Sequence, residues 1–591
     1  MILTEKQKKT FAILNQVLAL FGVISFVALL MMSGFYIGKT TIKVLTVVID
    51  VQMVLFIAQE IYRLWIIDEK MKLARSRIPE LLLSVVLFGY LILPDQLMGI
   101  LNAFMPTLKT ESVMVIYLSL SQLAIIAVLG RKLLKYGHAV NRLQLHSGQV
   151  LTISFACLIM FGTFLMSLPK AVPADCPRLD FIDAFFTATS AVCVTGLTVF
   201  NVATQLSFTG QMFLLVLVQI GGFGVMTITA MFAIFSSGGI SFQMRVMMGD
   251  ILSEGSLTNV TSLIEKIIQY TFVIEFVGAI CLYISLGGNL LAIDGDLLYV
   301  AVFHSITGFC NAGFSTFSQN MMAPELVNNL GFLFTISWLI IVGGIGFTVM
   351  QNVMNLHPFR RREKRLRYQL TVTSKLILIA SAVLIIVPTM LIFFLQDFDF
   401  APQIASMENL INSFFLAVSS RTAGFNNIDP ATFAQPLVVV VIILMIIGAA
   451  PGSTAGGVKV TTFAVVFIAF WRMLRGEDRL VLFNREIHRE YVRKALMIIF
   501  AYCVLCTFAM FLLSLIEPDK PLLDIAFEAV SALSTVGMSR NVTPTLGTGG
   551  KAILICLMFV GRVGTLSFFL AFHRPKMPIN KKLPKTSVII G

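Results

Sequence analysis

Charged residues are scarce in this sequence. Asp, Glu, Lys and Arg make up 13% of the 591 residues, about half the share usual in soluble proteins. Hydrophobic residues make up 57%, and the mean hydropathy is +0.88. Apolar segments long enough to cross about 30 Å of hydrocarbon recur from residue 11 almost to the C-terminus. The composition excludes a soluble multidomain protein and predicts a membrane protein.

Residues and patterns typical of catalysis are also few. The chain has six histidines and eight cysteines, and no serine, histidine and acid grouping or metal-ligand spacing stands out. Cys503 and Cys506 form a C-x-x-C inside an apolar segment, where two small apolar residues on one helix explain them. His304 is predicted to be a packing residue. We predict no enzyme and no bound cofactor.

Three glycine-rich fragments, at 221–224, 343–346 and 561–564, resemble pieces of dinucleotide fingerprints. They lie inside apolar segments, where small residues allow helices to approach closely. We therefore interpret them as helix-packing residues.

Basic residues exceed acidic ones and give a formal net charge of +13. They gather at alternate connections between apolar segments, in residues 63–77, 130–142, 357–367, 471–494 and 573–585. This pattern follows the positive-inside rule, so the charge orients the chain and does not indicate nucleic-acid binding. It places both termini in the cytoplasm. It also predicts four leading helices, near residues 11–36, 40–66, 78–99 and 111–130. About eight more helices are expected after them.

The stretch 191–200 contains Val194, Thr195 and Gly196, which resemble the Thr-Val-Gly core of potassium-channel filters. Three related stretches follow it. In each copy a phenylalanine precedes a glycine by the same number of positions, in the pairs Phe186 and Gly196, Phe303 and Gly313, Phe414 and Gly424, and Phe527 and Gly537. Four copies at near-equal intervals make chance a poor explanation.

Each copy lies between two apolar spans. The preceding spans are 148–168, 264–288, 371–396 and 491–516, and the following spans are 207–235, 325–352, 435–470 and 546–573. A short segment between them opens with an acid, which is Asp183, Asp296, Glu408 or Asp524. This order predicts a unit that occurs four times: a helix, a re-entrant pore helix, an extended loop and a second helix.

Such loops suit a cation pore. Non-helical backbone at membrane depth is tolerated where it is buried or lines water, and a ring of carbonyls can replace the hydration shell of an ion. Glycine allows the backbone angles that turn carbonyls toward an axis. Acids at the helix N-termini leave the negative C-terminal ends aimed at the cation.

From about residue 148 to 573 the chain resembles the Trk/Ktr/HKT superfamily of potassium transporters, in its bacterial Trk/Ktr-type membrane subunits. The resemblance implies an all-α membrane protein with four membrane-pore-membrane repeats around a pseudo-fourfold cation pore, preceded here by about four extra transmembrane helices. It implies K⁺ binding at twelve filter positions: Val194, Thr195, Gly196, Asn311, Ala312, Gly313, Thr422, Ala423, Gly424, Thr535, Val536 and Gly537. Relatives that prefer sodium tend to carry serine at the position of Gly196.

Two further features carry the resemblance. Proline and several glycines should break the helix within 435–470, where the family has an intramembrane gating loop; the matching residues are Gly448, Ala449, Ala450, Pro451, Gly452, Ser453, Thr454, Ala455, Gly456 and Gly457. Arg562 lies inside the last apolar span, where a charge is costly unless it is paired, and the family arginine at this position contacts the loop. The alternatives are a kinked helix without a gating role and an arginine that snorkels to the membrane surface.

The resemblance also implies a homodimer, a separate cytoplasmic ring of nucleotide-binding regulatory subunits, and a location in the cell membrane among lipids. The extra leading helices lack the arginine row of a voltage sensor, which favours a scaffold or dimer contact. A less selective monovalent-cation channel, a cation symporter, and a membrane-embedded enzyme or carrier remain as alternatives. The expected parts are 1–147 (leading helices), 148–263, 264–370, 371–490 and 491–575 (repeats one to four), and 576–591 (basic tail).

Overall fold

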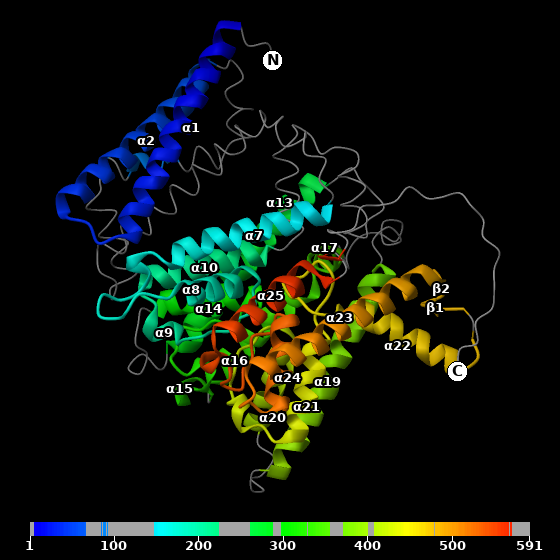
Figure 1. The fold of residues 1–591 in the computed structure, drawn as a ribbon. Helices are drawn as coiled ribbons and strands as arrows, with labels where there is room; N and C mark the ends of the chain where they lie inside the picture. The colour runs from blue at the N-terminus through cyan, green and yellow to red at the C-terminus, as the bar shows by residue number, and fades with distance from the viewer. Residues whose placement is uncertain are drawn as a thin grey trace, which may run out of the picture.

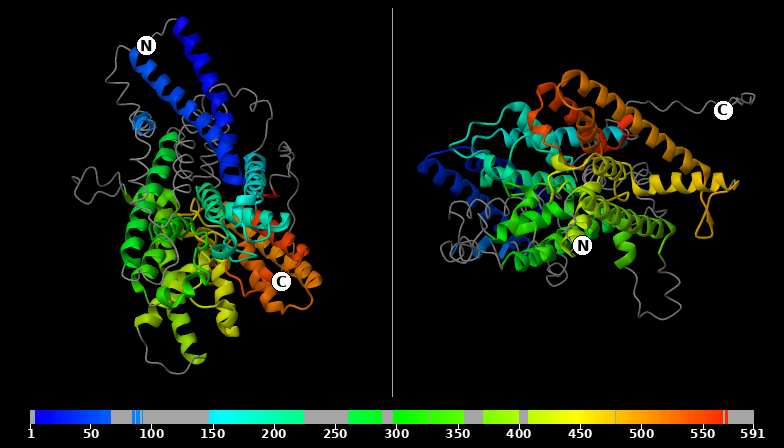
Figure 2. Two further views of the ribbon diagram at one scale, coloured as in Figure 1. Left: turned by 90° about the vertical axis from the view of Figure 1, so that its left-hand side faces the viewer. Right: turned by 90° about the horizontal axis from the view of Figure 1, so that it is seen from below.

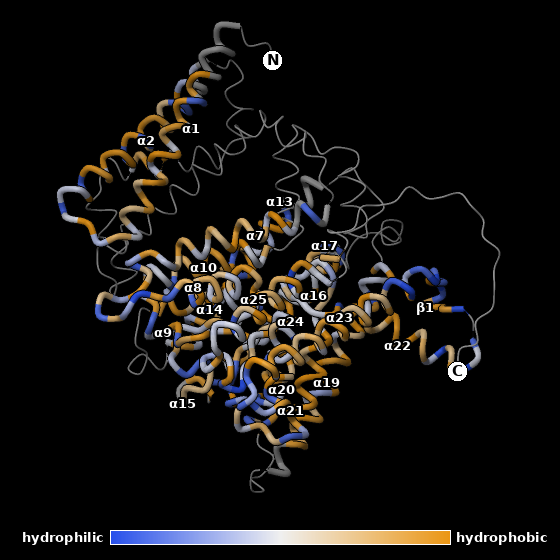
Figure 3. Tube along the Cα trace, in the orientation of Figure 1, coloured by the Kyte–Doolittle hydropathy of each residue, from blue (hydrophilic) through white to orange (hydrophobic). Residues whose placement is uncertain are grey.

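The computed structural model is almost entirely helical where it describes the chain (Figure 1). It describes residues 5–66, 84–85, 87–89, 92, 147–223, 260–287, 297–327, 329–354, 370–399, 407–477, 479–565 and 568–569. Five of the described helices are long and apolar enough to cross a membrane, or six if the bent pair α16–α17 counts as one span. Figure 3 shows apolar residues along most of the helices and hydrophilic residues near the ends and connections. A mostly helical chain, with helices long and apolar enough to cross a membrane, is thus confirmed among the described residues.

Two leading helices, α1 (Glu5–Gly34) and α2 (Lys39–Ile66), pack against each other at the edge of the molecule (Figure 2). The pair is tied to the main body at residues 170–172. Lys170 Nζ donates a hydrogen bond to the carbonyl of Met32 at 2.9 Å, and the Tyr36 hydroxyl donates to Val172 O at 3.3 Å. The expected helices near 78–99 and 111–130 lie outside the described residues, except for a few positions.

After these, a long helix, a short helix, a non-helical segment and a second helix follow one another four times. The sets are α7 (Ser147–Met166), α8 (Phe181–Val192) and α10 (Phe208–Gly222); α13 (Val260–Leu286), α14 (Leu297–Cys310) and α16 (Leu330–Ile345); α19 (Val372–Asp399), α20 (Met407–Thr422), α21 (Gln435–Ile446) and α22 (Val460–Leu474); and α23 (Arg489–Ile516), α24 (Leu522–Leu533) and α25 (Thr548–Val563). Smaller elements are η3 (Pro169–Ala171), α9 (Val202–Gln205), η4 (Asn320–Met322), α15 (Pro324–Val327), α17 (Phe347–Met354), η5 (Pro430–Thr432), η6 (Thr543–Thr545), β1 (Val481–Leu482) and β2 (Arg485–Glu486). The boundaries expected between the repeats stay a prediction.

The short helices α8 and α24 have 12 residues each, or about 18 Å at 1.5 Å per residue, too short to cross the hydrocarbon. Asp183, Glu408 and Asp524 lie in the first turns of α8, α20 and α24, where a carboxylate favours the helix N-terminus. Asp296 lies outside the described residues.

A fully buried phenylalanine anchors each short helix in the core. These residues are Phe186, Phe303, Phe415 and Phe527, each with 0% exposure. In the third helix the sequence pattern selects Phe414, but Phe414 is only partly buried and Phe415 occupies the core. The fixed spacing fails here because α20 continues to Thr422 and its turn is one residue shorter.

The second helices are interrupted. Gly346 (φ 92°) separates α16 from α17, which bend by 98°, and Gly564 (φ 90°) ends α25. Residues 447–459 separate α21 from α22, and the right-hand view of Figure 2 shows α22 projecting from the body. Glycine permits these left-handed turns without a Cβ clash.

Candidate ion filter and gate

The four expected filter segments lie against one another in a closed ring. At each filter glycine a Cβ would overlap the carbonyl oxygen of the residue before the next glycine: Ala312 for Gly196, Ala423 for Gly313, Val536 for Gly424, and Thr195 for Gly537. The fourth segment therefore returns to the first. The structure brings all four segments together, although they are far apart in the sequence.

All four glycines adopt left-handed backbone angles, with φ of 91° at Gly196, 68° at Gly313, 75° at Gly424 and 99° at Gly537. In three segments a residue two positions earlier is left-handed as well, namely Val194, Asn311 and Thr535. Each of them ends its short helix in a Schellman turn; in the first, Thr195 N–H donates to Ser190 O at 2.8 Å and Val194 N–H to Ala191 O at 3.1 Å. A β-branched residue such as Val194 pays for this conformation with strain of about 1–3 kcal/mol, so the surrounding contacts must hold it.

Serine hydroxyls brace the segments from behind. Ser190 Oγ accepts from Gly196 N–H at 3.1 Å and donates to Leu197 O at 2.7 Å, and Ser531 Oγ accepts from Gly537 N–H at 3.1 Å. In the third segment Ser419 Oγ donates to Phe425 O at 2.6 Å. Sequence reasoning missed these residues, although a serine at a similar place in three short helices was a visible clue.

Hydroxyl and amide side chains are found at the positions just before the ring glycines. The hydroxyls of Thr195 and Thr535 are buried, with no hydrogen-bond partner in the described part of the chain. The Asn311 amide fits its surroundings when its nitrogen donates to Gly308 O and Ile340 O and its oxygen accepts from Thr422 Oγ1 at 2.9 Å. At these positions Asn311 and Thr422 therefore share a hydrogen bond between two segments, and the hydroxyls of Thr195 and Thr535 have no described partner.

The expected gate segment is non-helical and lies against Thr535 and the end of α14. Its two ends pair with each other, since Gly448 N–H donates to Val458 O at 2.9 Å. Thr454 Oγ1 reaches the carbonyls of Phe309 at 3.3 Å and Gly343 at 3.2 Å. A Cβ at Gly456 would overlap the Thr535 hydroxyl. The segment thus touches the second and fourth sets as well as its own.

Arg562 connects the gate segment to two other helices. Its guanidinium donates to the carbonyl oxygens of Thr454 in the gate segment and Gly221 in α10. The residue is only 7% exposed, so it does not snorkel to the surface. Lys459 Nζ donates to Ala455 O at 2.6 Å, and Arg421, which sequence reasoning missed, donates through Nη2 to Gly448 O at 3.4 Å.

The glycine fragments at 221–224, 343–346 and 561–564 do allow close packing where the structure describes them. A Cβ at Gly221, Gly343 or Gly561 would overlap a carbonyl near the C-terminal end of the short helix in its own set, that of Val192, Phe309 or Leu533 respectively. These contacts bring the second helices to the edge of the ring.

His304 stabilises the segment that follows the second filter glycine. Its Nδ1–H donates to Val300 O at 2.8 Å, and its Nε2 faces Ser315 Oγ at 3.0 Å. Both ring nitrogens are satisfied in a site with 0% exposure. The predicted packing role is confirmed.

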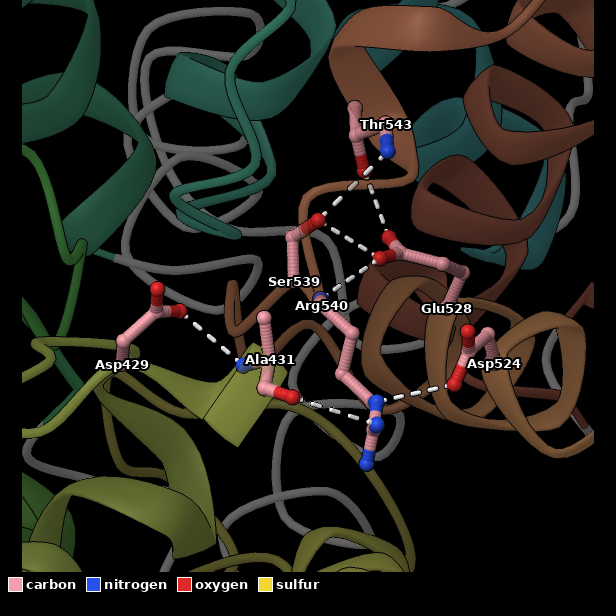
Figure 4. A network of polar contacts seen from close by, with 7 residues as sticks. All are labelled: Asp429, Ala431, Asp524, Glu528, Ser539, Arg540 and Thr543. Carbon is pink, nitrogen blue, oxygen red and sulfur yellow. Dashed lines mark hydrogen bonds and ion pairs between the residues drawn. The ribbon is translucent and has the colours of Figure 1, made fainter. Parts of the chain in front are cut away.

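Glu528 has the corresponding place in the fourth set (Figure 4). It is 1% exposed and accepts hydrogen bonds from Ser539 Oγ at 2.6 Å, Arg540 N–H at 3.0 Å and Thr543 Oγ1 at 2.5 Å. The Arg540 side chain pairs with Asp524 at 2.8 Å. The carboxylate therefore ties the segment after the filter to α24.

Comparison with known proteins gives consistent matches. The family model "TrkH: Cation transport protein" matches residues 121–582. The potassium/sodium uptake protein NtpJ of Enterococcus hirae is 34% identical over 76% of this chain and 98% of its own. The Ktr system potassium uptake proteins B of Vibrio alginolyticus and Bacillus subtilis are each 35% identical over 75% of this chain, covering 94% and 96% of their own lengths. The crystal structure of the potassium transporter TrkH from Vibrio parahaemolyticus superposes with a TM-score of 0.59 at 16% identity, covering 94% of this chain and 98% of that one.

We expect Glu528→Ala to lower the free energy of unfolding by about 3 kcal/mol, because three donors lose a buried charged acceptor. Glu528→Gln should cost about 1 kcal/mol, because the amide keeps one acceptor oxygen. SDS titration in mixed micelles measures both. Glu517→Ala is the matched control, since Glu517 accepts one described hydrogen bond, from Gly547 N–H at an exposed site. Equal losses in Glu528→Ala and Glu517→Ala would contradict a bracing role for Glu528.

Proposed function

The chain belongs to the TrkH family of cation transport proteins, and we propose that it carries potassium into the cell through the ring of filter segments. It is a multi-pass membrane protein, and its family is one of transporters and not of enzymes. We assign no resident cofactor, and K⁺ is the transported substrate.

The closed ring of four left-handed glycines is the observation that carries this proposal. Amide groups on its outer side are bound by serine hydroxyls and helix carbonyls, which leaves filter carbonyls for an ion in place of water. Each short helix also presents about half a negative charge at its C-terminal end. The unpaired hydroxyls of Thr195 and Thr535 are further oxygen donors. Relatives named for potassium uptake support the same substrate.

A less selective Na⁺/K⁺ channel or a cation symporter is the second candidate. The relative named for potassium/sodium uptake favours keeping it. The two candidates differ in ion replacement, because a potassium filter should pass rubidium and reject sodium. Flux into liposomes with potassium, rubidium and sodium in turn decides between them.

We assign the segment Gly448–Gly457 and Arg562 to a gate next to the filter. The segment lies against Thr535 and the end of α14, and the guanidinium holds it at Thr454. A cation leaving the ring meets both the backbone of the segment and a fixed positive charge. Displacement of the segment opens the path.

We further propose a homodimer in the cell membrane, with both termini in the cytoplasm and a separate nucleotide-binding ring as regulatory partner. Support comes from relatives named as parts of a Ktr system. The basic stretches 357–367 and 474–494 are docking surfaces for that ring or for lipid headgroups; the first lies outside the described residues, and the second begins at the last residue of α22.

We expect Gly196→Ser to raise sodium permeation relative to potassium, because a side chain cannot fit beside Ala312 O without moving the ring. Ion-replacement flux in liposomes measures the ratio. Gly476→Ser is the control, since Gly476 is also left-handed, at φ 73°, but has nothing within 4 Å of a Cβ. An unchanged ratio in folded Gly196→Ser protein would argue against this filter.

We expect deletion of residues 450–456 to raise potassium flux and to reduce its dependence on a regulatory partner. The deletion should be tolerated, since a Cβ at Gly448 would lie 3.4 Å from Gly457 Cα and the remaining ends are therefore already close. Flux with and without cytosolic extract measures the effect. A stable deletion protein with unchanged or lower flux would show that the segment does not close the path.

We expect potassium flux to be highest in Arg562→Ala and intermediate in Arg562→Gln. In Arg562→Lys it should stay near that of the wild type. Two unit charges about 6 Å apart repel by roughly 3 kcal/mol at an effective dielectric near 20, which slows conduction on the order of a hundredfold. Glutamine keeps bulk without charge, and lysine keeps the charge. Liposome flux of the three variants measures the order. If Ala and Gln conduct no faster than wild type, Arg562 is a packing residue.

A further inference from the structure

One buried cation near the gate has no place in the mechanism above. Arg421 lies in the last turn of α20 and is 7% exposed. The other three short helices, α8, α14 and α24, carry no basic residue in their last turns. A guanidinium at membrane depth is costly, so its presence indicates a role.

The Arg421 side chain reaches out of its own helix to the entry of the gate segment. Its Nη2 donates to the carbonyl oxygen of Gly448 at 3.4 Å. Gly448 follows the last turn of α21 and pairs with Val458, where the chain leaves the segment again. Arg421 therefore contacts the position at which the two ends of the gate segment meet.

No carboxylate neutralises this charge in the part of the chain that the structure describes. Ion pairs described there include Arg472 with Glu477, Arg540 with Asp524, and Lys551 with Asp183, and none of these involves Arg421. The Arg421 Nε is buried without a hydrogen-bond partner among the described residues. The guanidinium is thus balanced by the carbonyl oxygen of Gly448 and by the negative end of α20, and this contact is weaker than an ion pair and easier to release.

Arg421 also adjoins the filter in the chain. The next three residues are Thr422, Ala423 and Gly424, which form the third filter segment. A movement of α20's last turn when an ion enters the ring therefore acts on the Gly448 contact, and a movement of the gate acts on the filter. Such coupling between two sites is reciprocal.

We propose that Arg421 is a positioning residue that couples the filter to the gate, by holding the entry of the gate segment to the last turn of α20. Arg562 holds the same segment at its middle, through Thr454. The inference rests on the proposed function, because it takes 448–457 as the gate. It adds a second contact that must be released on opening and a route by which filter occupancy reaches the gate.

Hydrogen exchange of the peptide 448–458 tests the contact without any transport measurement. In Arg421→Met we expect exchange on the order of tenfold faster than in wild type, because a charge-assisted hydrogen bond is lost. Potassium should slow exchange in wild type relative to choline, and this difference should vanish in Arg421→Met. Arg421→Lys should restore it in part, because lysine keeps the charge and can donate a hydrogen bond but lacks the planar guanidinium. Arg472→Met is the control, since Arg472 lies on α22 in the same set and pairs with Glu477.

Three results would overturn the inference. In the first, the peptide 448–458 exchanges hydrogen as slowly in Arg421→Met as in wild type. In the second, potassium still slows this exchange in Arg421→Met. The third is a lower melting temperature with unchanged exchange, which would make Arg421 only a cap of α20.

Potassium flux in liposomes separates the inference from the proposed function. We expect Arg421→Met to raise flux in the absence of a partner, and Arg421→Met with Arg562→Ala to raise it by about the product of the single effects. If the wild type carries no potassium while exchange still rises in Arg421→Met, the contact stands and the transport function is wrong. If the wild type carries potassium and Arg421→Met equals it in flux and exchange, the inference is wrong and the function stands.

Discussion

A chain that leaves the helix inside a membrane must satisfy its amide and carbonyl groups within the protein, because lipid offers no partners. This constraint organises the centre of the molecule. The amides of Gly196 and Gly537 in the ring donate to Ser190 and Ser531, and the amide of Gly448 donates to Val458 O. Since these ring N–H groups are bound by serine hydroxyls, the carbonyls of the ring are left for the ion in the function proposed above. The pairing of backbone amides that stabilises the fold thus also leaves free the carbonyl groups on which the proposed ion binding depends.

Close approach is the second condition, and small residues meet it. Gly221, Gly343 and Gly561 each bring a second helix against the end of a short helix, at distances that exclude a Cβ. In α25 the residue after Gly561 is Arg562, whereas glycine follows Gly221 and Gly343. At this position α25 therefore carries a long cationic side chain, whereas α10 and α16 carry a glycine. Among these three helices the arginine contact with the segment 448–457 is made by α25, although the ring itself is nearly regular.

The sequence predicted the helical class, the four glycines and the broken helix at 448–457, because each depends on local spacing or composition. It did not predict that Phe415 replaces Phe414 in the core, because a one-residue change in the α20 turn is invisible to fixed spacing. Ser190, Ser419 and Ser531 look like ordinary polar residues until their partners are known. Arg421 was missed because its partner, Gly448, lies in a different helix connection.

The long-range contacts of α25 impose an order on how the protein is made. Arg562 binds Gly221, and Lys551 pairs with Asp183 at 2.5 Å, so the fourth set joins directly to the first. Chains grow from the N-terminus and fold in that order. The fourth ring segment, 535–537, comes shortly before α25 in the chain, and the guanidinium that binds the segment 448–457 lies within α25. The last stretch of the chain to be synthesised therefore supplies both the closing segment of the ring and the side chain that binds 448–457.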